Sequence, residues 1–235
     1  MIQGRINSIE TLGTLDGPGV RFVAFLQGCK LRCKYCHNPE TWNIKGESKI
    51  ITSSELVNKI EKYKNYFGDK GGVTFSGGEP LLQPEFLLSC LKLCKEKNIH
   101  TCIDTAGVGF GDYDEILKYT DLVILDIKAV NEDEYTELTG QPMTFFREFL
   151  SQAIKANKKF WLRQVIVPTI NDDKKHIDLL KSFASNIPNV EKIELLPYKT
   201  IGVHKYRTLN LPYRLEGIPE LSQEKLDELN RYLNN

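Results

Sequence analysis

The sequence predicts an α/β fold in which six βα units form one parallel sheet covered by helices. Apolar runs rich in β-branched residues alternate with segments of helical periodicity. The runs are almost continuously hydrophobic, which is typical of parallel strands covered by helices. No Pro-, Gly- or Ser-rich linker divides the 235 residues. Six units are too few for an eight-stranded barrel, so we expect a partial barrel.

Each expected strand is a short apolar run, and each expected helix has apolar residues three or four positions apart. One helical segment is broken near Gly140–Pro142, because glycine and proline disfavour a helix interior. In chain order we expect strand Arg21–Gln27 then helix Ser54–Phe67, strand Gly72–Phe75 then helix Pro84–Lys97, strand His100–Asp104 then helix Asp112–Tyr119, strand Asp121–Ile127 then helical segment Glu132–Asn157, strand Lys159–Val167 then helix Asp172–Ser185, and strand Val190–Leu196 then helix Ser222–Leu233.

Composition and charge narrow the class of protein. The chain is 41% hydrophobic and 26% charged, as an ordinary soluble globule is. It has 31 Lys and Arg against 31 Asp and Glu, so we expect neither a nucleic-acid nor a membrane partner. No apolar run approaches the ~18–20 residues of a membrane span, and Met1–Glu10 lacks a secretory signal. We expect one cytoplasmic domain over residues 1–235, acting as a monomer.

Polar and glycine-rich sequences follow the expected strands. In parallel α/β folds the active site lies at the carboxyl ends of the strands. We therefore expect thiols, carboxylates and cations to meet on one rim of the sheet. The strand ends concerned are Gly28-Cys29, Ser76-Gly77-Gly78-Glu79, Asp104-Thr105-Ala106-Gly107, Asp126-Ile127-Lys128, Arg163 within its strand, and Pro197-Tyr198-Lys199.

Cys29, Cys33 and Cys36 form a CxxxCxxC pattern that His37 follows directly. In a reducing compartment, clustered cysteines of this kind indicate metal binding. A zinc site would use the three thiols and His37, although adjacent ligands are awkward for one ion. CxxCH also matches haem attachment, which would leave Cys29 without a role. An iron–sulfur cluster with three thiolates would keep one iron open for chemistry.

The cysteine pattern resembles the signature of the radical S-adenosylmethionine (SAM) superfamily. Within it, blocks from Gly4 to about Arg207 are similar to the family of pyruvate formate-lyase activating enzymes. These blocks are Gly4-Arg5-Ile6, Asp16-Gly17-Pro18-Gly19-Val20-Arg21-Phe22, Gln27-Gly28-Cys29, Tyr35-Cys36-His37-Asn38-Pro39, Ser76-Gly77-Gly78-Glu79, Asp104-Thr105, Leu125-Asp126-Ile127-Lys128 and Ile193-Glu194-Leu195-Leu196-Pro197-Tyr198.

The resemblance implies a (β/α)6 partial TIM-type barrel and a radical oxidoreductase. It implies a [4Fe–4S] cluster on Cys29, Cys33 and Cys36, with SAM at the open iron. The protein substrate would be pyruvate formate-lyase, on which a 5′-deoxyadenosyl radical removes a glycine Cα hydrogen. Reduced flavodoxin or ferredoxin would supply the electron, in anaerobic glucose metabolism. No cysteine occurs in Asn38–Thr74, so the ferredoxin-like insert of some related activators is absent.

Two alternatives stay open at this point. The chain resembles activators of other glycyl radical enzymes, so its substrate could be a different one. It could also be a non-catalytic iron–sulfur or zinc protein, although a simple carrier needs no SAM pocket. Cys90, Cys94 and Cys102 lie apart from the cluster pattern, and we expect them to pack in the core.

The expected SAM pocket combines residue chemistry with the resemblance. Glycines let a ligand approach the backbone, and Glu79 could accept a hydrogen bond from the SAM ammonium group. Arg163 in an apolar strand needs a carboxylate, either that of SAM or that of an Asp or Glu. Asp126 and Lys128 share one strand face, where they could also form a rim salt bridge. The expected cofactor-binding residues are Tyr35, Cys36, His37, Gly77, Gly78, Glu79, Asp104, Asp126, Ile127, Lys128 and Arg163.

Three further expectations follow from the resemblance. Asp104, Thr105 and Asp126 would form a monovalent-cation site, since oxygen ligands suit a hard cation. The Asp16-Gly17-Pro18-Gly19 turn would contact the protein substrate. Lys199 stands where the resembled pattern has a histidine that approaches SAM, and the sequence alone does not decide whether Lys199 replaces it. No catalytic acid or base is expected.

Overall fold

The structure of the chain is a computed structural model that describes residues 2–110 and 113–235. Asp112, the first residue of one expected helix, lies outside the described residues. The described strands form a single sheet in the order β3-β1-β2-β4-β5-β6-β7-β8. Their bounds are β1 Gln3–Gly13, β2 Arg21–Leu26, β3 Lys49–Thr52, β4 Gly72–Gly77, β5 His100–Thr105, β6 Leu122–Asp126, β7 Lys159–Ile166 and β8 Val190–Pro197.

The parallel part of the sheet confirms the predicted fold. Strands β2, β4, β5, β6, β7 and β8 are parallel neighbours in chain order, as six βα units require. The prediction missed β1 and β3, which extend the sheet as antiparallel strands beside β2. Strand β1 alternates exposed and buried residues, and β3 has only four residues. Neither therefore shows the continuous apolar run of a strand covered by helices.

The predicted helices are present, with shorter α-helical bounds in some cases. Thr52 and Glu55 form a capping box at the start of α1, and Asn131 caps α4. Gly140, with φ of +70°, ends α4 and confirms the predicted break. Helix α7 was not predicted. The helices are α1 Ser53–Glu61, α2 Pro84–Glu96, α3 Asp114–Lys118, α4 Glu132–Thr139, α5 Thr144–Lys155, α6 Lys174–Ser185, α7 Val203–Thr208 and α8 Gln223–Leu233, with 3-10 turns η1 Pro39–Thr41, η2 Lys64–Tyr66 and η3 Pro80–Leu82.

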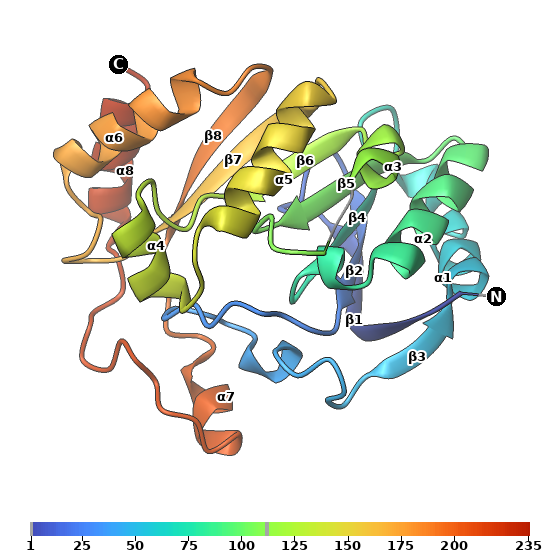
Figure 1. Cartoon of the computed structure of the whole chain (residues 1–235), viewed down its shortest axis with the longest axis horizontal. Coiled ribbons are helices and arrows are strands. Elements are labelled where there is room, and N and C mark those ends of the chain that lie inside the picture. Colours follow the sequence, from blue (N-terminus) through green and yellow to red (C-terminus); the bar gives the residue numbers. More distant parts are fainter. Residues whose placement is uncertain (1, 111–112) are drawn as a thin grey trace.

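The main core lies between the sheet and its covering helices. Phe75, Leu125 and Leu162 contribute strand side chains to it, and Cys90 and Cys94 contribute thiols from α2. Cys102 is buried in a separate small cluster, so all three remaining cysteines pack in apolar surroundings as predicted. Figure 1 shows α2, α3 and α5 in front of the sheet and the segment after β2 running along its lower edge toward α4.

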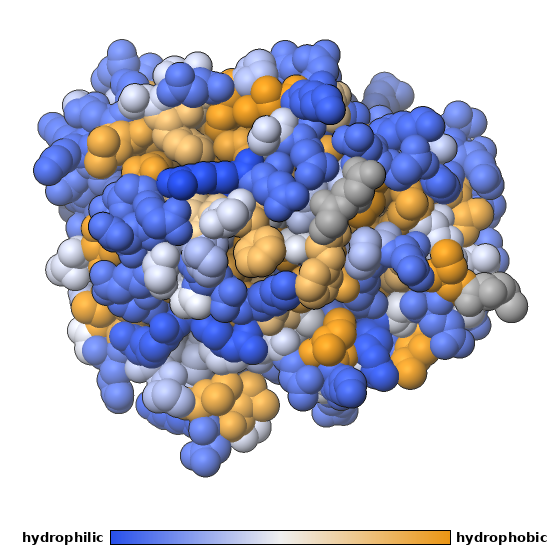
Figure 2. Space-filling view, in the orientation of Figure 1, coloured by the Kyte–Doolittle hydropathy of each residue, from blue (hydrophilic) through white to orange (hydrophobic). Residues whose placement is uncertain are grey.

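The two faces of each strand differ, because successive side chains point to opposite sides. Thr74 and Asp104 alternate with the core residues Val73, Phe75 and Ile103, so they lie on the concave face. Most of the surface in Figure 2 is hydrophilic, with separate hydrophobic areas. Within the described residues, no helix has the length and apolar character needed to span a membrane.

Candidate active site

The three predicted cluster cysteines lie on the segment that joins β2 to η1. The segment begins at Gly28, whose φ of +104° suits glycine. A Cβ at Gly28 would lie 2.5 Å from Ile44 Cδ1, so a larger residue would push this turn apart. The backbone N–H of Cys36 donates to the carbonyl of Cys33 at 3.1 Å, which curls the segment back on itself.

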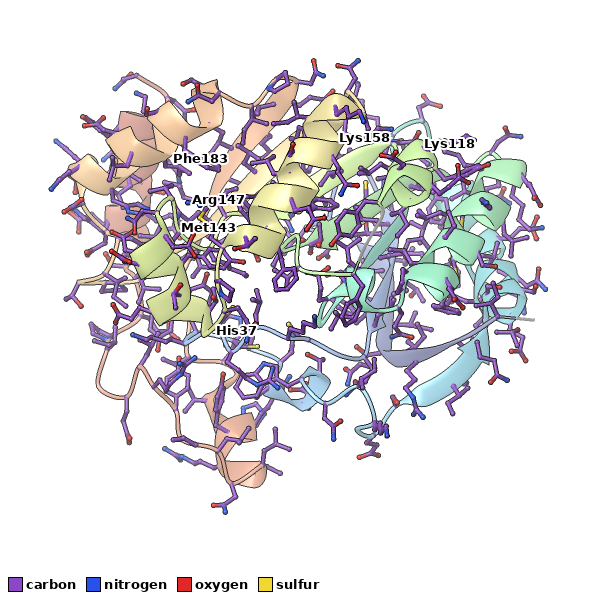
Figure 3. The ribbon with its side chains drawn as sticks, in the orientation of Figure 1. His37, Lys118, Met143, Arg147, Lys158 and Phe183 are labelled. Atoms are coloured by element: carbon purple, nitrogen blue, oxygen red, sulfur yellow. The ribbon has the colours of Figure 1, made fainter. Side chains whose placement is uncertain are left out.

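Helix α4 holds the cysteine segment over the sheet. The backbone N–H of Arg32 donates to the carbonyl of Thr139 at 2.7 Å, and that of Lys34 donates to Leu138 at 3.0 Å. Figure 3 shows His37 on this segment, below the start of α5 where Met143 and Arg147 are labelled. Backbone hydrogen bonds to α4 therefore fix the cysteine segment, and the sequence alone does not predict them.

The thiols lie in surroundings that suit a cluster. All three contact a buried apolar group that includes Val108 and Val167. Burial raises the pKa of Cys33 to about 12, and it also raises the pKa values of Cys29 and Cys36. The charge of a neighbouring thiol also raises the pKa values of Cys29 and Cys33. Iron would supply the positive charge that keeps such thiolates deprotonated, so the donor set fits an iron–sulfur cluster.

His37 is engaged away from the thiols. Its Nε2 lies 2.9 Å from the carbonyl oxygen of Lys199, which weighs against the zinc alternative with His37 as a ligand. In the described part of the chain, no three His, Cys, Asp or Glu side chains surround a point where a single metal ion could bind. The Lys199 ammonium group pairs with Glu220 at 3.1 Å. His204 is exposed on α7.

The glycines at the end of β4 bring this strand against the cysteine segment. Gly77 has a φ of +116°, and a Cβ there would lie 2.2 Å from the backbone nitrogen of Leu26. A Cβ at Gly78 would lie 2.2 Å from the carbonyl oxygen of Gly28. The backbone N–H of Glu79 donates to that same carbonyl at 2.8 Å. The predicted glycine turn therefore lies directly beside the first cluster cysteine.

Glu79 is fully buried, and its carboxylate has partners within the chain. It accepts hydrogen bonds from Thr105 Oγ1 at 2.5 Å, Ala106 N at 2.9 Å and Leu81 N at 3.1 Å. Burial raises the pKa of Glu79 to about 7, although these hydrogen bonds lower it. Glu79 thus ties the loop after β4 to the loop after β5, whereas the sequence favoured the SAM ammonium group as its partner.

Arg163 is held by carboxylates of the protein itself. Its Nε donates to Glu194 Oε2 at 2.8 Å, and its Nη1 lies 3.7 Å from Asp104 Oδ2. Its Nη2 donates to the backbone carbonyl of Leu15. The structural pair that the sequence left open as an alternative is therefore present. Asp104 also accepts from Ser76 Oγ at 2.9 Å, and burial raises the pKa of Asp104 to about 6.

Three buried polar atoms without hydrogen-bond partners in the described chain gather near Cys33. They are Tyr35 Oη, Asp126 Oδ1 and Tyr135 Oη. Each of these residues interacts electrostatically with Cys33 or with its neighbour Lys128. Buried polar groups are costly without partners, so this region fits a polar ligand such as SAM. The sequence missed Tyr135, because a tyrosine on an amphipathic helix looks like an ordinary core residue.

Lys128 links the end of β6 to the cysteine segment. Its ammonium group lies 2.5 Å from Asp126 Oδ2 and 5.5 Å from the centre of the Tyr35 ring. Burial lowers the pKa of Lys128, but Asp126, Tyr35 and Cys33 together raise it well above its ordinary value. The two side chains therefore share one strand face as predicted and form an ion pair there.

Two arginines hold the predicted substrate loop against the concave face. Arg21 Nη1 donates to the carbonyl of Pro18 at 3.3 Å, and Thr74 Oγ1 donates to the carbonyl of Asp16 at 2.6 Å. Arg163 holds Leu15 on the other side. The sequence missed this role of Arg21, which is completely buried. A charge in an apolar strand needs partners, as the sequence indicated for Arg163. The same reasoning, applied to Arg21, predicts that this buried arginine holds polar groups of the chain.

Comparison with known proteins agrees with the fold and with the family that the sequence resembles. A family model described as the Radical SAM superfamily matches residues 23–180. The pyruvate formate-lyase-activating enzyme of Clostridium pasteurianum is 55% identical over 234 residues, which are 99% of this chain and 98% of that protein. Its counterpart in Staphylococcus epidermidis is 45% identical over 242 residues, covering 100% and 96% of the two chains.

Solved structures support the same assignment. A domain of a pyruvate-formate lyase-activating enzyme from Bacteroides vulgatus has a TM-score of 0.56 at 27% identity, over 70% of this chain and 93% of that one. Streptococcus suis SuiB, solved with S-adenosylmethionine, has a TM-score of 0.65 at 17% identity over 88% and 45% of the chains, which concerns the fold alone. The chain therefore belongs to the radical SAM superfamily and, within it, to the pyruvate formate-lyase-activating enzymes. Membership implies a [4Fe–4S] cluster and SAM as cofactors.

Proposed function

We propose that this chain activates pyruvate formate-lyase by removing a Cα hydrogen from one glycine of that protein. One observation carries the proposal: the segment with the three thiols packs against the glycine turn after β4. Beside it lie three polar atoms, of Tyr35, Asp126 and Tyr135, that have no hydrogen-bond partner among the described residues. The named function of the close relatives supports it. When bound, the cluster and SAM supply the 5′-deoxyadenosyl radical by one-electron reductive cleavage of SAM.

Cys29, Cys33 and Cys36 would hold three irons of the cluster and leave the fourth open to SAM. The chain itself then has to bind, orient and exclude water, because hydrogen-atom abstraction needs no catalytic acid or base. Gly77 and Gly78 allow close approach to the backbone. The residues proposed to bind SAM or to shape its pocket are Tyr35, Cys36, His37, Gly77, Gly78, Glu79, Asp104, Asp126, Ile127, Lys128 and Arg163, with Tyr135 added from its position.

Within this set, the contacts distinguish ligand-facing residues from positioning residues. Glu79 and Arg163 use their polar atoms on other protein groups, so we assign them to positioning the loops. Tyr35, Tyr135 and Asp126 each keep an atom free for a ligand within the described chain. A monovalent cation is proposed on Asp104, Thr105 and Asp126, since the unpartnered Asp126 Oδ1 is an oxygen donor in need of a partner.

The Asp16-Gly17-Pro18-Gly19 loop is proposed to receive the glycine-bearing segment of pyruvate formate-lyase. Its backbone carbonyls at Asp16 and Pro18 are already used by Thr74 and Arg21, which leaves its remaining polar groups for a partner. Leu15, 81% exposed, adds an apolar contact point at its edge.

The remaining parts of the proposal concern setting and assembly. We propose a cytoplasmic monomer consisting of one domain, without a ferredoxin-like insert. Reduced flavodoxin or ferredoxin would donate the electron, and the reaction would serve anaerobic glucose metabolism. Neither nucleic acid nor a membrane is a proposed partner, in line with the neutral net charge.

An anaerobic EPR assay tests the function directly. Reconstituted protein, SAM, a reductant and inactive pyruvate formate-lyase should give a glycyl-radical doublet together with lyase activity. Deoxyadenosine without the doublet would move the substrate to another glycyl radical enzyme. Absence of both deoxyadenosine and an iron–sulfur absorption band would overturn the radical assignment.

Matched cysteine variants sharpen this assay. Cys33→Ala should abolish SAM cleavage, because it removes a proposed cluster ligand. Cys90→Ala also removes one buried thiol, but from α2 in the main core, and should retain SAM cleavage. Robust turnover by Cys33→Ala would contradict the proposed ligand set.

A further inference from the structure

A cavity of about 1080 Å³ lies behind the cysteine segment. Its walls come from that segment, from β1 and the start of β3, and from the chain after α7. Trp42, Leu211 and Pro212 provide apolar surface, and Arg32 and Arg214 provide exposed cations. Among the described residues, none that we assign to the SAM pocket lines it. The cavity is therefore separate from the proposed SAM pocket.

Trp42 joins this cavity to a cluster ligand. Its backbone carbonyl accepts a hydrogen bond from the backbone N–H of Cys29 at 3.2 Å. The guanidinium of Arg32 lies 4.8 Å from the centre of its ring. Tyr206 packs edge-on against Trp42 at 5.8 Å and donates from its hydroxyl to the carbonyl of Cys36 at 3.0 Å. Trp42 thus lines the cavity and is tied to Cys29 through its backbone and to Cys36 through Tyr206.

The cavity is lined by three cations, Arg32, Lys49 and Arg214, and by two carboxylates, Glu40 and Glu47, and the chain segments around it are strongly basic. Residues 29–49 and 199–214 together carry nine Lys and Arg against two Glu, a formal charge of +7. The rest of the chain carries −7, because the whole is neutral. Some of these cations are paired: Lys34 with Glu137, Lys199 with Glu220 and Lys205 with Glu40. Arg32, Lys49 and Arg214 are exposed along the wall of the cavity.

We propose that this basic cavity docks the small acidic one-electron carrier protein that reduces the cluster, with Trp42 as the contact next to Cys36. The inference rests on the proposed function, which requires an electron from outside. A positive surface attracts a negatively charged carrier and speeds its arrival. Electron-transfer encounters use small interfaces, for which an apolar floor with a charged rim is sufficient. The carrier approaches from a side that SAM and the glycine-bearing substrate do not need.

The test reverses charge on the cavity wall without changing the cysteine segment. The variant is Lys49→Glu with Arg214→Glu. Its matched control is Lys155→Glu with Lys175→Glu, which makes the same net change on exposed positions of α5 and α6. Reduced flavodoxin is the probe carrier, and dithionite is the small-molecule reductant. Cluster reduction is followed by visible absorbance in a stopped-flow instrument, without SAM or pyruvate formate-lyase, at low and high salt.

At low salt, the cavity variant should be reduced by flavodoxin at least tenfold more slowly than the wild type and should bind flavodoxin more weakly by titration. The rate at which flavodoxin reduces the cavity variant should lose most of its salt dependence. Its reduction by dithionite should be unchanged, and flavodoxin should reduce the control variant at the wild-type rate. Equal flavodoxin rates in the two double variants would overturn the docking site. A separate assay with SAM and pyruvate formate-lyase completes the test: normal reduction of the cavity variant with impaired activation of pyruvate formate-lyase would overturn the docking site and assign the basic surface to the protein substrate. If the wild type is reduced normally yet never cleaves SAM, the proposed function fails rather than the docking site.

Discussion

Replacement of Gly77 by alanine tests whether the end of β4 is pinned against the cysteine segment. Gly77 and Gly217 both have positive φ, at +116° and +83°, so alanine is strained at either position. A Cβ at Gly77 would lie 2.2 Å from Leu26 N and 2.5 Å from Leu26 O. A Cβ at Gly217 would meet nothing within 4 Å. Gly217→Ala is therefore a matched control that carries the strain without the collision.

The two variants should lose different amounts of the free energy of unfolding. Positive φ costs an alanine about 1–2 kcal/mol, and this applies to both. Overpacking adds about 1–3 kcal/mol at Gly77, where the colliding atoms belong to the backbone of β2 and cannot rotate away. We expect Gly77→Ala to lose roughly 2–5 kcal/mol and Gly217→Ala roughly 1–2 kcal/mol. At about 2–4 °C per kcal/mol, the melting temperatures should differ by several degrees.

Anaerobic urea unfolding of the cluster-loaded protein, followed by circular dichroism, measures this difference. A SAM titration of the same samples provides the second readout. Gly77→Ala should also lose SAM affinity, because Gly78 and Glu79 would move away from Gly28. Gly217→Ala should keep it. Equal stability losses in the two variants would refute the view that β4 ends in enforced backbone contact with β2.

Three further predictions concern single side chains. The pKa of Glu79, about 7 against an ordinary 4.5, means that its stabilising contribution is full below about pH 4.5 and is lost as pH rises through 7. The free energy of unfolding of Glu79→Gln relative to wild type should therefore rise by roughly 3 kcal/mol over that range, and a flat difference in pH-dependent unfolding would contradict the burial argument. The Trp42 side chain lowers the pKa of Cys36 against the effect of burial, so Trp42→Phe should lower the cluster potential by about 20–60 mV in an EPR-monitored redox titration, and an unchanged potential would contradict this stabilisation of negative charge at the sulfur. Tyr135→Phe should weaken SAM binding by about 2–12-fold in equilibrium titrations without lowering thermal stability, and lost stability with normal SAM affinity would assign Tyr135 to the core.

Much of the fold could be predicted from the sequence because the signals were local. The six parallel strands are continuous apolar runs, and Gly140–Pro142 marks the break between α4 and α5. Strands β1 and β3 escaped prediction because they lack a continuous apolar run: β1 pairs with β2, and the four-residue β3 pairs only with β1 within the described sheet. Helix α7 has six residues, too few for a clear periodic pattern.

The site divides in the same way between local and tertiary information. The sequence alone determined the chemistry: the spacing of Cys29, Cys33 and Cys36 and the glycine turn at Gly77–Gly78 define a cluster with an adjacent ligand pocket. Only the tertiary structure decided which polar atoms are already used. Glu79 and Arg163 are occupied by protein partners from other parts of the chain, whereas the Tyr135 hydroxyl has no hydrogen-bond partner among the described residues. The physical reason is that a hydrogen bond requires atoms within about 3 Å, and strand order, rather than position in the sequence, brings those atoms together.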